Sequence, residues 1–416
     1  MKKLSFLVLA ILVSSISYSQ SGWVKVTDSI PNLVIMSMQF TSANTGYACG
    51  SYGTTIPGAV LRTTNGGLNW IVTQFPEYSA DDLTFLNDNT GYISAWQGPG
   101  KSYVLKTTNG GVNWNKLDSN ASSFFKIKFY DSNNGMVVSK YNTSHRTTDG
   151  GNTWITRYDN ALWSEPNSLI CLNAETWLVA DKGYGIIKTT SGGANWEHIY
   201  SSNMQGVSMY FLNSTTGFLV DYYAKVFKTT NAGNNWFKID SIANVNNFND
   251  ANITFTDNST GYIASENYVY KTTNGGYNWS RLLVRTNYWG YSSYFINSNT
   301  GFVGGQSGFI YRTTTGGTIG VNNISTEVPS KYSLSQNYPN PFNPITNVKF
   351  SIVNAGDVKI VVYDIQGREV QTLVNERLKP GTFEVKFDGS MLTSGVYFYK
   401  MVTEGYSETK KMLLIK

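Results

Sequence analysis

Short segments in which apolar and polar residues alternate run through most of the chain, and turn-forming residues separate them. One unit illustrates the pattern: a segment ends at Phe85, others cover residues 91–95 and 104–108, and a fourth begins at Trp114. Such alternation over four to eight residues is typical of half-buried β-strands, and no segment keeps a helical period of 3.6 residues. The pattern predicts an all-β protein with almost no helix.

A sequence box recurs along the first three quarters of the chain. Its commonest form is Thr-Thr-Asn-Gly-Gly-x-Asn-Trp after a Lys or Arg, and the boxes begin at Thr63, Thr107, Thr147, Thr189, Thr229, Thr272 and Thr313. Successive boxes lie 44, 40, 42, 40, 43 and 41 residues apart. This spacing fits four short strands per unit, which make one blade of a β-propeller. A second signature, Gly followed by an aromatic residue, recurs in phase with the box.

The seventh box lacks its tryptophan, and the N-terminal region carries a candidate to replace it. Residues 21–26 contain Trp23 and resemble the tryptophan-bearing outer strand of the other units. We therefore expect this segment to supply the outer strand of the last blade and to close the ring. The sequence predicts a seven-bladed propeller over residues 20–320.

The first 19 residues have the pattern of a signal peptide. Lys2 and Lys3 precede an apolar segment at 4–16, and Ser17 and Ser19 occupy the −3 and −1 positions of a cleavage site before Gln20. An uncleaved anchor is the alternative. No later segment is apolar and long enough to span a membrane, so we expect no integral membrane segment after cleavage.

The net charge of +5 is unevenly distributed along the chain. Residues 21–330 contain 19 basic and 19 acidic groups, so the propeller region is neutral overall. Nucleic-acid affinity depends largely on neutralising phosphates, so we expect no nucleic-acid partner. Cys49 and Cys171 lie in different repeats, which argues against a disulfide, and we expect a monomer.

The segment from Thr147 to Trp154 resembles the Asp box, S/T-x-D-x-G-x-T-W, and the other boxes are relaxed versions of it. Asp boxes (BNR-like repeats) occur in sialidases, sortilin-type receptors and photosystem II assembly-factor propellers. The repeated TTNGGxNW with its Gly-aromatic strands is most similar to the photosystem II stability/assembly-factor type. The resemblance implies that the box is a structural turn, and it indicates fold more than function.

The sequence contains no clear set of catalytic residues. A sialidase needs an arginine cluster, but three of the six propeller arginines precede boxes. We expect no catalytic residue, no metal site and no cofactor: His145 occupies a strand position, and no Cys/His spacing suggests zinc. Two alternatives stay open. One is a secreted glycoside hydrolase or lyase that uses Asp81, Asp82, Asp181 or Asp221 as acids, and the other is a periplasmic assembly factor.

Aromatic residues that the repeat does not require fall near the connections between the second and third strands and between successive blades. Such a concentration on one side of the ring is typical of a recognition surface. We expect a protein or glycan ligand to be bound by Trp96, Arg157, Trp163, Tyr222, Tyr223, Arg285, Tyr288 and Trp289. The rival interpretation is that these aromatics pack over the central channel.

The composition changes after residue 320. A Pro/Asn-rich linker is expected at 321–345, followed by six strands at 346–416 that suggest a small immunoglobulin-like β-sandwich. YPNPFNP at 338–344 and the closing KKMLLIK resemble the type A C-terminal sorting domain of the type IX (Por) secretion system of the Bacteroidota and relatives. The resemblance implies type IX machinery as a partner, a secreted or outer-membrane surface-attached protein, and a sorting signal that includes Gly367, Arg368, Gly395, Tyr397, Lys410, Lys411 and Lys416.

Overall fold

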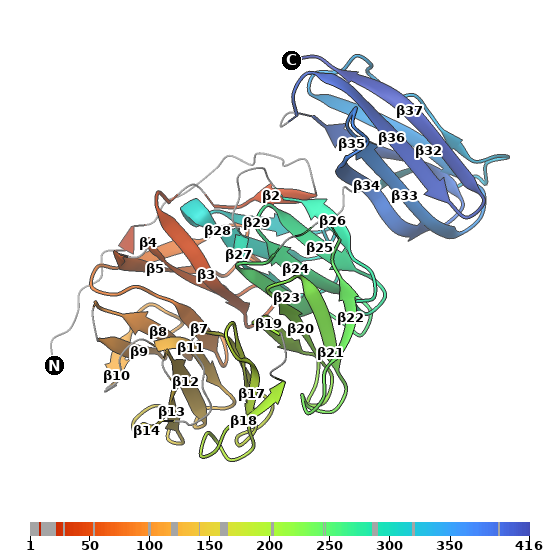
Figure 1. Cartoon of the computed structure of the whole chain (residues 1–416). Coiled ribbons are helices and arrows are strands. Elements are labelled where there is room, and N and C mark those ends of the chain that lie inside the picture. The colour runs from red at the N-terminus through yellow and green to blue at the C-terminus, as the bar shows by residue number, and fades with distance from the viewer. Residues whose placement is uncertain are drawn as a thin grey trace.

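The structure is a computed structural model. It describes residues 8–9 and 22–416, except 28–29, 53–54, 99–100, 118–123, 141, 159–164, 201–203, 244, 246, 285–289, 318–320 and 390–391. The elements in these ranges are β-strands, apart from one 3₁₀ turn, η1 (Gln306–Gly308). Figure 1 shows a ring of β-sheets and a separate β-unit at the C-terminal end. The prediction of an all-β protein is confirmed.

Seven antiparallel sheets form the ring, each with the strand order A-B-C-D; six have four strands, and blade 1 has a fifth, β1, beside its strand D. The A strands of neighbouring blades contact each other, so they line the axis. Blades 1 to 3 are β3 (Leu33–Phe40), β4 (Gly46–Tyr52), β5 (Thr55–Thr63), β6 (Ile71–Phe75); β7 (Asp82–Phe85), β8 (Gly91–Trp96), β9 (Ser102–Thr107), β10 (Asn115–Leu117); and β11 (Phe124–Phe129), β12 (Gly135–Ser139), β13 (Thr143–Thr147), β14 (Ile155–Tyr158). Blades 4 to 6 are β15 (Pro166–Cys171), β16 (Trp177–Asp181), β17 (Gly185–Thr189), β18 (Glu197–Tyr200); β19 (Gly206–Phe211), β20 (Gly217–Asp221), β21 (Lys225–Thr229), β22 (Phe237–Ser241); and β23 (Ala251–Phe255), β24 (Gly261–Ser265), β25 (Tyr268–Thr272), β26 (Ser280–Leu283). Blade 7 is β27 (Gly290–Phe295), β28 (Gly301–Gly305), β29 (Ile310–Thr313) and β2 (Trp23–Lys25), and β1 (Val8–Leu9) pairs with β6.

The N-terminal strand closes blade 7, as the missing tryptophan predicted. β2 pairs antiparallel with β29, and Trp23 lies opposite Thr313. Trp23 is fully buried and meets Phe295 edge to face, with 6.0 Å between ring centroids. The Thr27 hydroxyl donates to the Gly308 carbonyl and accepts from Ile310 N–H, at 2.9 and 2.7 Å. The two ends of the propeller are therefore joined by both a sheet and a buried ring.

The Gly-aromatic signature joins most blades to the next. Its ring stacks on the phenylalanine that ends strand A of the following blade, as in Tyr47 on Phe85, with 3.5 Å between centroids. The same stack recurs for Tyr92 on Phe129, Phe218 on Phe255 and Tyr262 on Phe295. Phe85 also covers Gly91 of its own blade, where a Cβ would lie 2.4 Å from the ring. The glycine therefore leaves room for the phenylalanine that the neighbouring blade needs.

Polar side chains on the inner strands also bridge neighbouring blades. Gln39 donates to the carbonyl of Phe85 and accepts from its N–H, both at 2.9 Å, and Tyr294 donates to the Phe40 carbonyl at 2.9 Å. Similar bonds run from Ile127 N–H to Asp82, from Met209 N–H to Ser168 and from Ile253 N–H to Ser208. These bonds satisfy backbone groups that no other strand reaches, because inner strands of adjacent blades do not form a ladder.

The C-terminal unit is a sandwich of two four-stranded sheets, with the orders β30-β35-β32-β31 and β34-β33-β36-β37. The strands are β30 (Val321–Ser325), β31 (Ser333–Leu334), β32 (Ile345–Ile352), β33 (Gly356–Tyr363), β34 (Glu369–Leu378), β35 (Gly381–Asp388), β36 (Gly395–Thr403) and β37 (Tyr406–Leu414). One apolar core lies between the sheets. Residues 321–345 differ from the expected linker, because β30 pairs with β35 and β31 pairs with β32.

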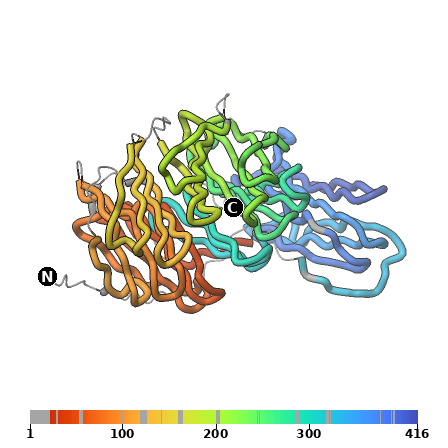
Figure 2. Tube along the Cα trace, turned by 90° about the horizontal axis from the view of Figure 1, so that it is seen from below, coloured from red at the N-terminus to blue at the C-terminus, as the bar shows by residue number. Residues whose placement is uncertain are grey.

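The C-terminal unit lies against the outer side of blade 6, where β34 contacts β26 (Figures 1 and 2). Among the described residues, two hydrogen bonds join the units. The Asn375 amide donates to the Ser280 hydroxyl at 2.5 Å, and the Arg281 guanidinium donates to the Glu369 carbonyl at 3.1 Å. The two units are thus in direct polar contact as well as covalently linked.

Candidate ligand-binding face

The boxes are hydrogen-bonded turns whose polar atoms satisfy the turn itself. In the third box the Thr147 hydroxyl accepts from Gly151 N–H at 2.8 Å and donates to Asp149 at 2.9 Å, while Asp149 accepts from the Thr153 hydroxyl and N–H. These bonds, the Thr153 hydroxyl first, lower the pKa of Asp149 to about 2. Asn replaces Asp149 in the boxes at Thr63, Thr107, Thr229 and Thr272 and keeps the bond. The geometry therefore supports a structural role.

The antiparallel strand order divides the connections between two faces of the ring. The A–B turns and the boxes share one face, which we call the box face. The B–C turns and the D–A connections share the other, the loop face, which includes residues 97–98, 182–184, 222–224, 266–267 and 306–309. The unassigned aromatics were expected on this second face.

The structure places four of the eight expected ligand-binding residues. Tyr222 and Tyr223 lie in the B–C turn of blade 5, on the loop face. Trp96 is the last residue of β8 and Arg157 lies within β14, so both belong to strands rather than to loops, because these strands extend further than the repeat suggested. Trp163, Arg285, Tyr288 and Trp289 fall outside the described residues, as does the expected signal peptide apart from Val8–Leu9.

Two tyrosines and two lysines form a cluster on the loop face between blades 4 and 5. The Tyr222 and Tyr223 rings meet edge to face, 5.3 Å apart. Lys182 lies over Tyr222 at 5.3 Å and Lys225 over Tyr223 at 5.2 Å, both within cation–π range. Sequence reasoning missed Lys182. The signal that could have identified it is its position in the repeat, because Lys182 follows Asp181 in blade 4 as Tyr222 follows Asp221 in blade 5.

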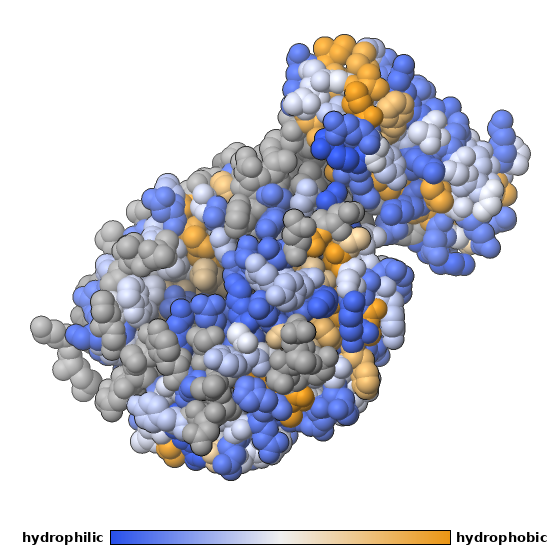
Figure 3. All heavy atoms as spheres, in the orientation of Figure 1, coloured by the Kyte–Doolittle hydropathy of each residue, from blue (hydrophilic) through white to orange (hydrophobic). Residues whose placement is uncertain are grey.

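Charges of both signs meet near the ends of the inner strands. Burial raises the pKa of Asp81 to about 6, against a hydrogen bond from Ser79 and the attraction of Lys126. Burial also raises the pKa of Asp250, against the opposing charges of Lys182 and Lys126. These groups come from blades 2, 3 and 4 and from the start of blade 6, so they surround the axis. In Figure 3, hydrophilic residues gather around the middle of the propeller.

The other acids considered for hydrolysis are held by backbone groups. Asp82 accepts from Ile127 N–H, Asp181 from the N–H groups of Glu165, Gly183 and Tyr184, and Asp221 from Lys225 N–H. All three carboxylates are buried. They lie at the ends of strands and hydrogen-bond the backbone of turns or neighbouring strands, as aspartates with a structural role commonly do.

Neither histidine lies near the axis. His145 is buried in strand C of blade 3, its Nδ1 lies 2.9 Å from the Thr156 hydroxyl, and burial lowers its pKa to about 4. His198 is exposed on the outer strand of blade 4. Within the described ranges, no group of three or more His, Cys, Asp or Glu is placed to hold a metal ion.

The expected sorting residues lie in one sheet of the sandwich, β34-β33-β36-β37, or in the turn and the tail that continue its strands. Gly367, with a φ of 75°, and Arg368 form the turn before β34, where Arg368 pairs with Asp364 at 2.7 Å. Gly395 and Tyr397 lie in β36, and the Tyr397 hydroxyl donates to the Thr393 carbonyl. Lys410 and Lys411 lie in β37, and Lys416 follows it. Because β36 and β37 are paired, with Phe398 opposite Lys411 and Tyr399 opposite Lys410, and because Lys416 N–H donates to the Ser394 hydroxyl, five of the seven residues lie at one end of two neighbouring strands.

The YPNPFNP segment covers the edge of β37. Phe342 donates to the Leu413 carbonyl and accepts from Ile415 N–H, both at 3.0 Å, while Asn340 accepts from Leu413 N–H at 2.9 Å. The Phe342 side chain is buried in the sandwich core. Covering the last strand in this way removes an exposed sheet edge.

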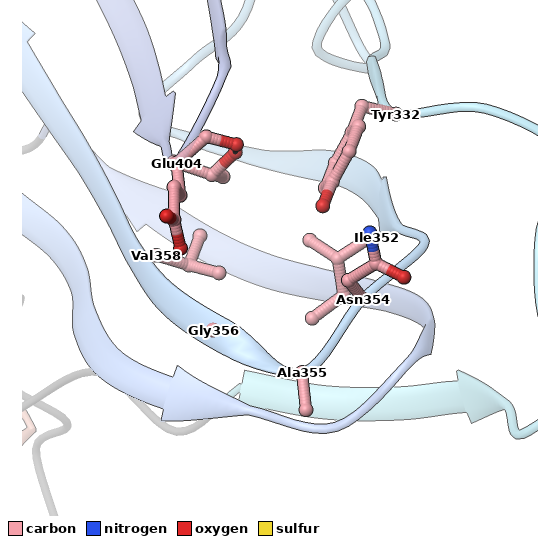
Figure 4. Close-up of a pocket in the computed structure, with 8 residues that line it drawn as sticks. Tyr332, Ile352, Asn354, Ala355, Gly356, Val358 and Glu404 are labelled. Atoms are coloured by element: carbon pink, nitrogen blue, oxygen red, sulfur yellow. Dashed lines mark hydrogen bonds between the residues drawn. The ribbon is translucent and has the colours of Figure 1, made fainter.

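Figure 4 shows a small pocket of about 310 Å³ at one end of the sandwich, with Tyr332 and Glu404 on its walls. Asn354 and Gly356 from the β32–β33 turn form another side. This pocket lies in the sorting unit and is separate from the loop face of the propeller.

Two family models match the chain. Residues 336–416 match the secretion system C-terminal sorting domain, and residues 118–236 match the photosynthesis system II assembly factor YCF48. The chain carries a YCF48-like propeller and a secretion sorting domain. Both expected resemblances are confirmed. No curated protein sequence matches the chain.

Several solved structures have a fold similar to that of this chain. The structure of YCF48 bound to D1 peptide is 18% identical, with a TM-score of 0.58 over 72% of this chain and 100% of that one. YCF48 from Cyanidioschyzon merolae is 18% identical, with a TM-score of 0.57 over 70% and 98%. A catalytically inactive virginiamycin B lyase from Staphylococcus aureus is 13% identical, with a TM-score of 0.56 over 70% and 98%. At such identities these likenesses establish the propeller fold alone.

The sorting domain implies export by the type IX system, and hence secretion or attachment to the cell surface. It also implies contact with the type IX machinery during export. Among the described residues, no helix is long and apolar enough to cross a membrane.

Proposed function

We propose that this protein is a non-catalytic binding protein that acts after export, and that its loop face holds a protein or glycan. The Tyr222–Tyr223 pair with its two lysines carries the proposal, because the repeat does not require these aromatics and Tyr223 is 46% exposed. Aromatic side chains with one polar end suit both peptides and sugars. The neighbour described as YCF48 bound to D1 peptide makes an extended peptide the first ligand class to test.

An enzymatic role has less support from the site. Asp82 and Asp181 accept backbone hydrogen bonds, and Asp221 accepts one from Lys225 N–H through Oδ1, while its Oδ2 is buried without a hydrogen-bond partner among the described residues. Asp81 lies just before the inner strand of blade 2, and no second acid is assigned to act with it. The virginiamycin B lyase neighbour is described as inactive when a histidine is replaced by alanine. In this chain both histidines lie on the outer half of a blade. We therefore favour binding over hydrolysis or elimination.

The proposal also includes the processing expected from the sequence. A signal peptide covers residues 1–19, the propeller covers 20–320, and the sorting unit follows from residue 321. The protein acts as a monomer. It has no nucleic-acid partner, since residues 21–330 carry no net charge.

The test compares two surfaces of similar exposure on the full chain. Peptide and glycan arrays select a ligand, and isothermal titration then measures its affinity for Tyr222→Ala/Tyr223→Ala. Loss of two aromatic contacts should weaken binding at least about tenfold. Tyr277→Ala is the control, because Tyr277 is 53% exposed but lies in a box. Equal affinity in both variants, or hydrolysis of an array glycan by the wild-type chain, would refute the proposal.

A further inference from the structure

A cleft of about 770 Å³ lies where the sorting unit meets the rim of the propeller. Trp279, Tyr270 and Arg281 of blade 6 line one side, and Tyr363, Lys359 and Arg368 of the sorting unit line the other. The volume is in the range of small-molecule sites, which occur preferentially at domain interfaces. The cleft is distinct from the loop face, so binding in it is independent of the proposed function.

One wall of the cleft holds a polar group that the protein leaves unused. Tyr270 is only 5% exposed, and its ring packs against Phe248 with 5.6 Å between centroids. No hydrogen bond joins its hydroxyl to another described residue. Burial raises the pKa of this hydroxyl, so it remains a donor across the physiological range. The hydroxyl is not one of the fully buried polar atoms that lack a partner, so it is open to the cleft and can donate to a ligand there.

The cationic groups of the cleft keep free hydrogen-bonding capacity. Arg281 uses Nη2 to donate to the Glu369 carbonyl and lies over the Tyr268 ring at 4.6 Å. Arg368 uses Nε to bind Asp364, and its side chain is 73% exposed. None of the ion pairs among the described residues includes Arg281 or Lys359. Several N–H donors on three cations therefore remain available.

The two acids of the cleft are already engaged. Asp364 accepts from the N–H groups of Gln366 and Arg368 as well as from the Arg368 guanidinium. Glu369 accepts from the Thr372 hydroxyl at 2.8 Å. The cleft is thus lined by three cations and two carboxylates, one of which is paired with Arg368, and the cations lie beside the aromatic rings of Trp279 and Tyr363.

We propose that this cleft binds an acidic saccharide, with the rings of Trp279 and Tyr363 against the sugar and Arg281, Lys359 and Arg368 at its carboxylate or phosphate. Guanidinium groups bind such oxyanions with paired hydrogen bonds, and aromatic faces suit the apolar face of a sugar ring. Because each unit supplies half of the contacts, the site is complete only while the sorting unit remains joined to the propeller.

Isothermal titration of the full chain tests this with three probes: trigalacturonate, mannose 6-phosphate and neutral maltotriose. We expect one of the acidic probes to bind, and Arg281→Gln/Lys359→Gln to weaken it by about tenfold or more. Lys349→Gln/Lys386→Gln is the matched control, because both lysines are exposed on the other sheet of the sandwich. This control should bind as the wild type does. Trigalacturonate and mannose 6-phosphate separate the carboxylate source from the phosphate source.

Lys359→Gln alone guards against an effect on folding, because Lys359 is exposed and makes no ion pair among the described residues. Weaker binding in this variant with an unchanged unfolding temperature supports the site. Binding of neither acid at millimolar concentration would overturn the proposal. So would maltotriose binding as tightly as the acids, or equal affinity in the two double variants.

Discussion

The propeller and the sorting unit distribute their buried residues in opposite ways. The propeller has several separate apolar clusters, and each lies largely between two neighbouring blades, such as the one that joins Tyr47 and Val60 to Phe85 and Ile93. The sorting unit has one continuous core between its two sheets. A local change in the propeller should therefore weaken one interface, whereas a change in the sandwich core should weaken the whole unit.

One interface of the propeller departs from this expectation. The junction of blades 6 and 7 depends on β2, which comes from the other end of the repeat region. Its Trp23 is 0% exposed, whereas the six box tryptophans of the other blades are each at least 5% exposed, and Trp154 and Trp279 are only partly buried. In blade 7 the outer strand and its tryptophan therefore come from a short segment at the other end of the propeller. In the other blades both come from the same continuous stretch of chain as the inner strands.

Deleting residues 21–28 should have the largest effect. The change removes β2, the Trp23 ring and the two hydrogen bonds of Thr27, which together stabilise the native state by about 5 kcal/mol or more. Differential scanning calorimetry should show a lower unfolding temperature for the propeller and an unchanged one for the sorting unit. Trp154→Ala is the comparison within an ordinary blade and should cost less. An unchanged propeller transition in the deletion would refute the closure argument.

Phe350→Ala tests the other half of the comparison. Phe350 is fully buried in the sandwich core and stacks on Phe383 with 5.5 Å between centroids. Its loss should cost about 3–5 kcal/mol, a large part of the stability of so small a unit. Calorimetry should show the sorting-unit transition lowered by more than about 10 °C and the propeller transition in place. Phe350→Leu should lie between the two, and a propeller transition that moved with the sandwich would mean the units unfold as one.

Much of the propeller could be predicted because its sequence signals are also its contacts. The first threonine of the box, the Gly-aromatic pair and the box tryptophan recur at matching positions of the repeat. Each forms the same hydrogen bond or ring contact in several blades, as Thr147 does with Gly151. Even the closure of the propeller could be predicted, because the seventh box lacks a tryptophan and Trp23 near the N-terminus can replace it. The linker was misjudged for a related reason. Residues 321–345 contain Asn, Ser and Pro, but β30 gains its order from pairing with β35, which local composition does not reveal.

The candidate sites were harder to predict, because their residues meet through tertiary structure. The interblade position of Lys182 against Tyr222 follows from the rotation of one blade relative to the next, which no spacing encodes. Arg281 is one of the three propeller arginines that do not precede a box, and its role at the cleft depends on where the sorting unit docks. Subtracting repeat residues from the sequence identifies candidates, but it cannot show which of them share a surface.

Thr147→Ala measures what one box contributes within the propeller. Thr147 is buried, and its loss leaves the Gly151 N–H without its acceptor, which should cost about 1–3 kcal/mol. Thr107→Ala should cost a similar amount because the Thr107 hydroxyl accepts from Gly111 N–H at 2.9 Å. Urea unfolding followed by tryptophan fluorescence gives both values. Thr147→Ser keeps the hydroxyl and should recover most of the loss; markedly different values at the two boxes would contradict the equivalence of the blades.

Asp81→Asn should have the smallest effect, and its sign depends on pH. The pKa of Asp81 in the native state is about 6, above its ordinary value of 3.8, because burial disfavours the charged form more than Ser79 and Lys126 favour it. The native state therefore binds this proton more tightly than the unfolded state, and stability falls as pH rises from about 4 to about 6. Asp81→Asn removes that penalty, so its unfolding temperature should exceed that of the wild type at pH 7, and the difference should shrink below pH 4. Asp82→Ala is the contrasting variant, because it leaves the Ile127 N–H without its acceptor and should destabilise the propeller. A lower unfolding temperature for Asp81→Asn at pH 7 would instead mean that the Asp81 charge stabilises the axis through Lys126.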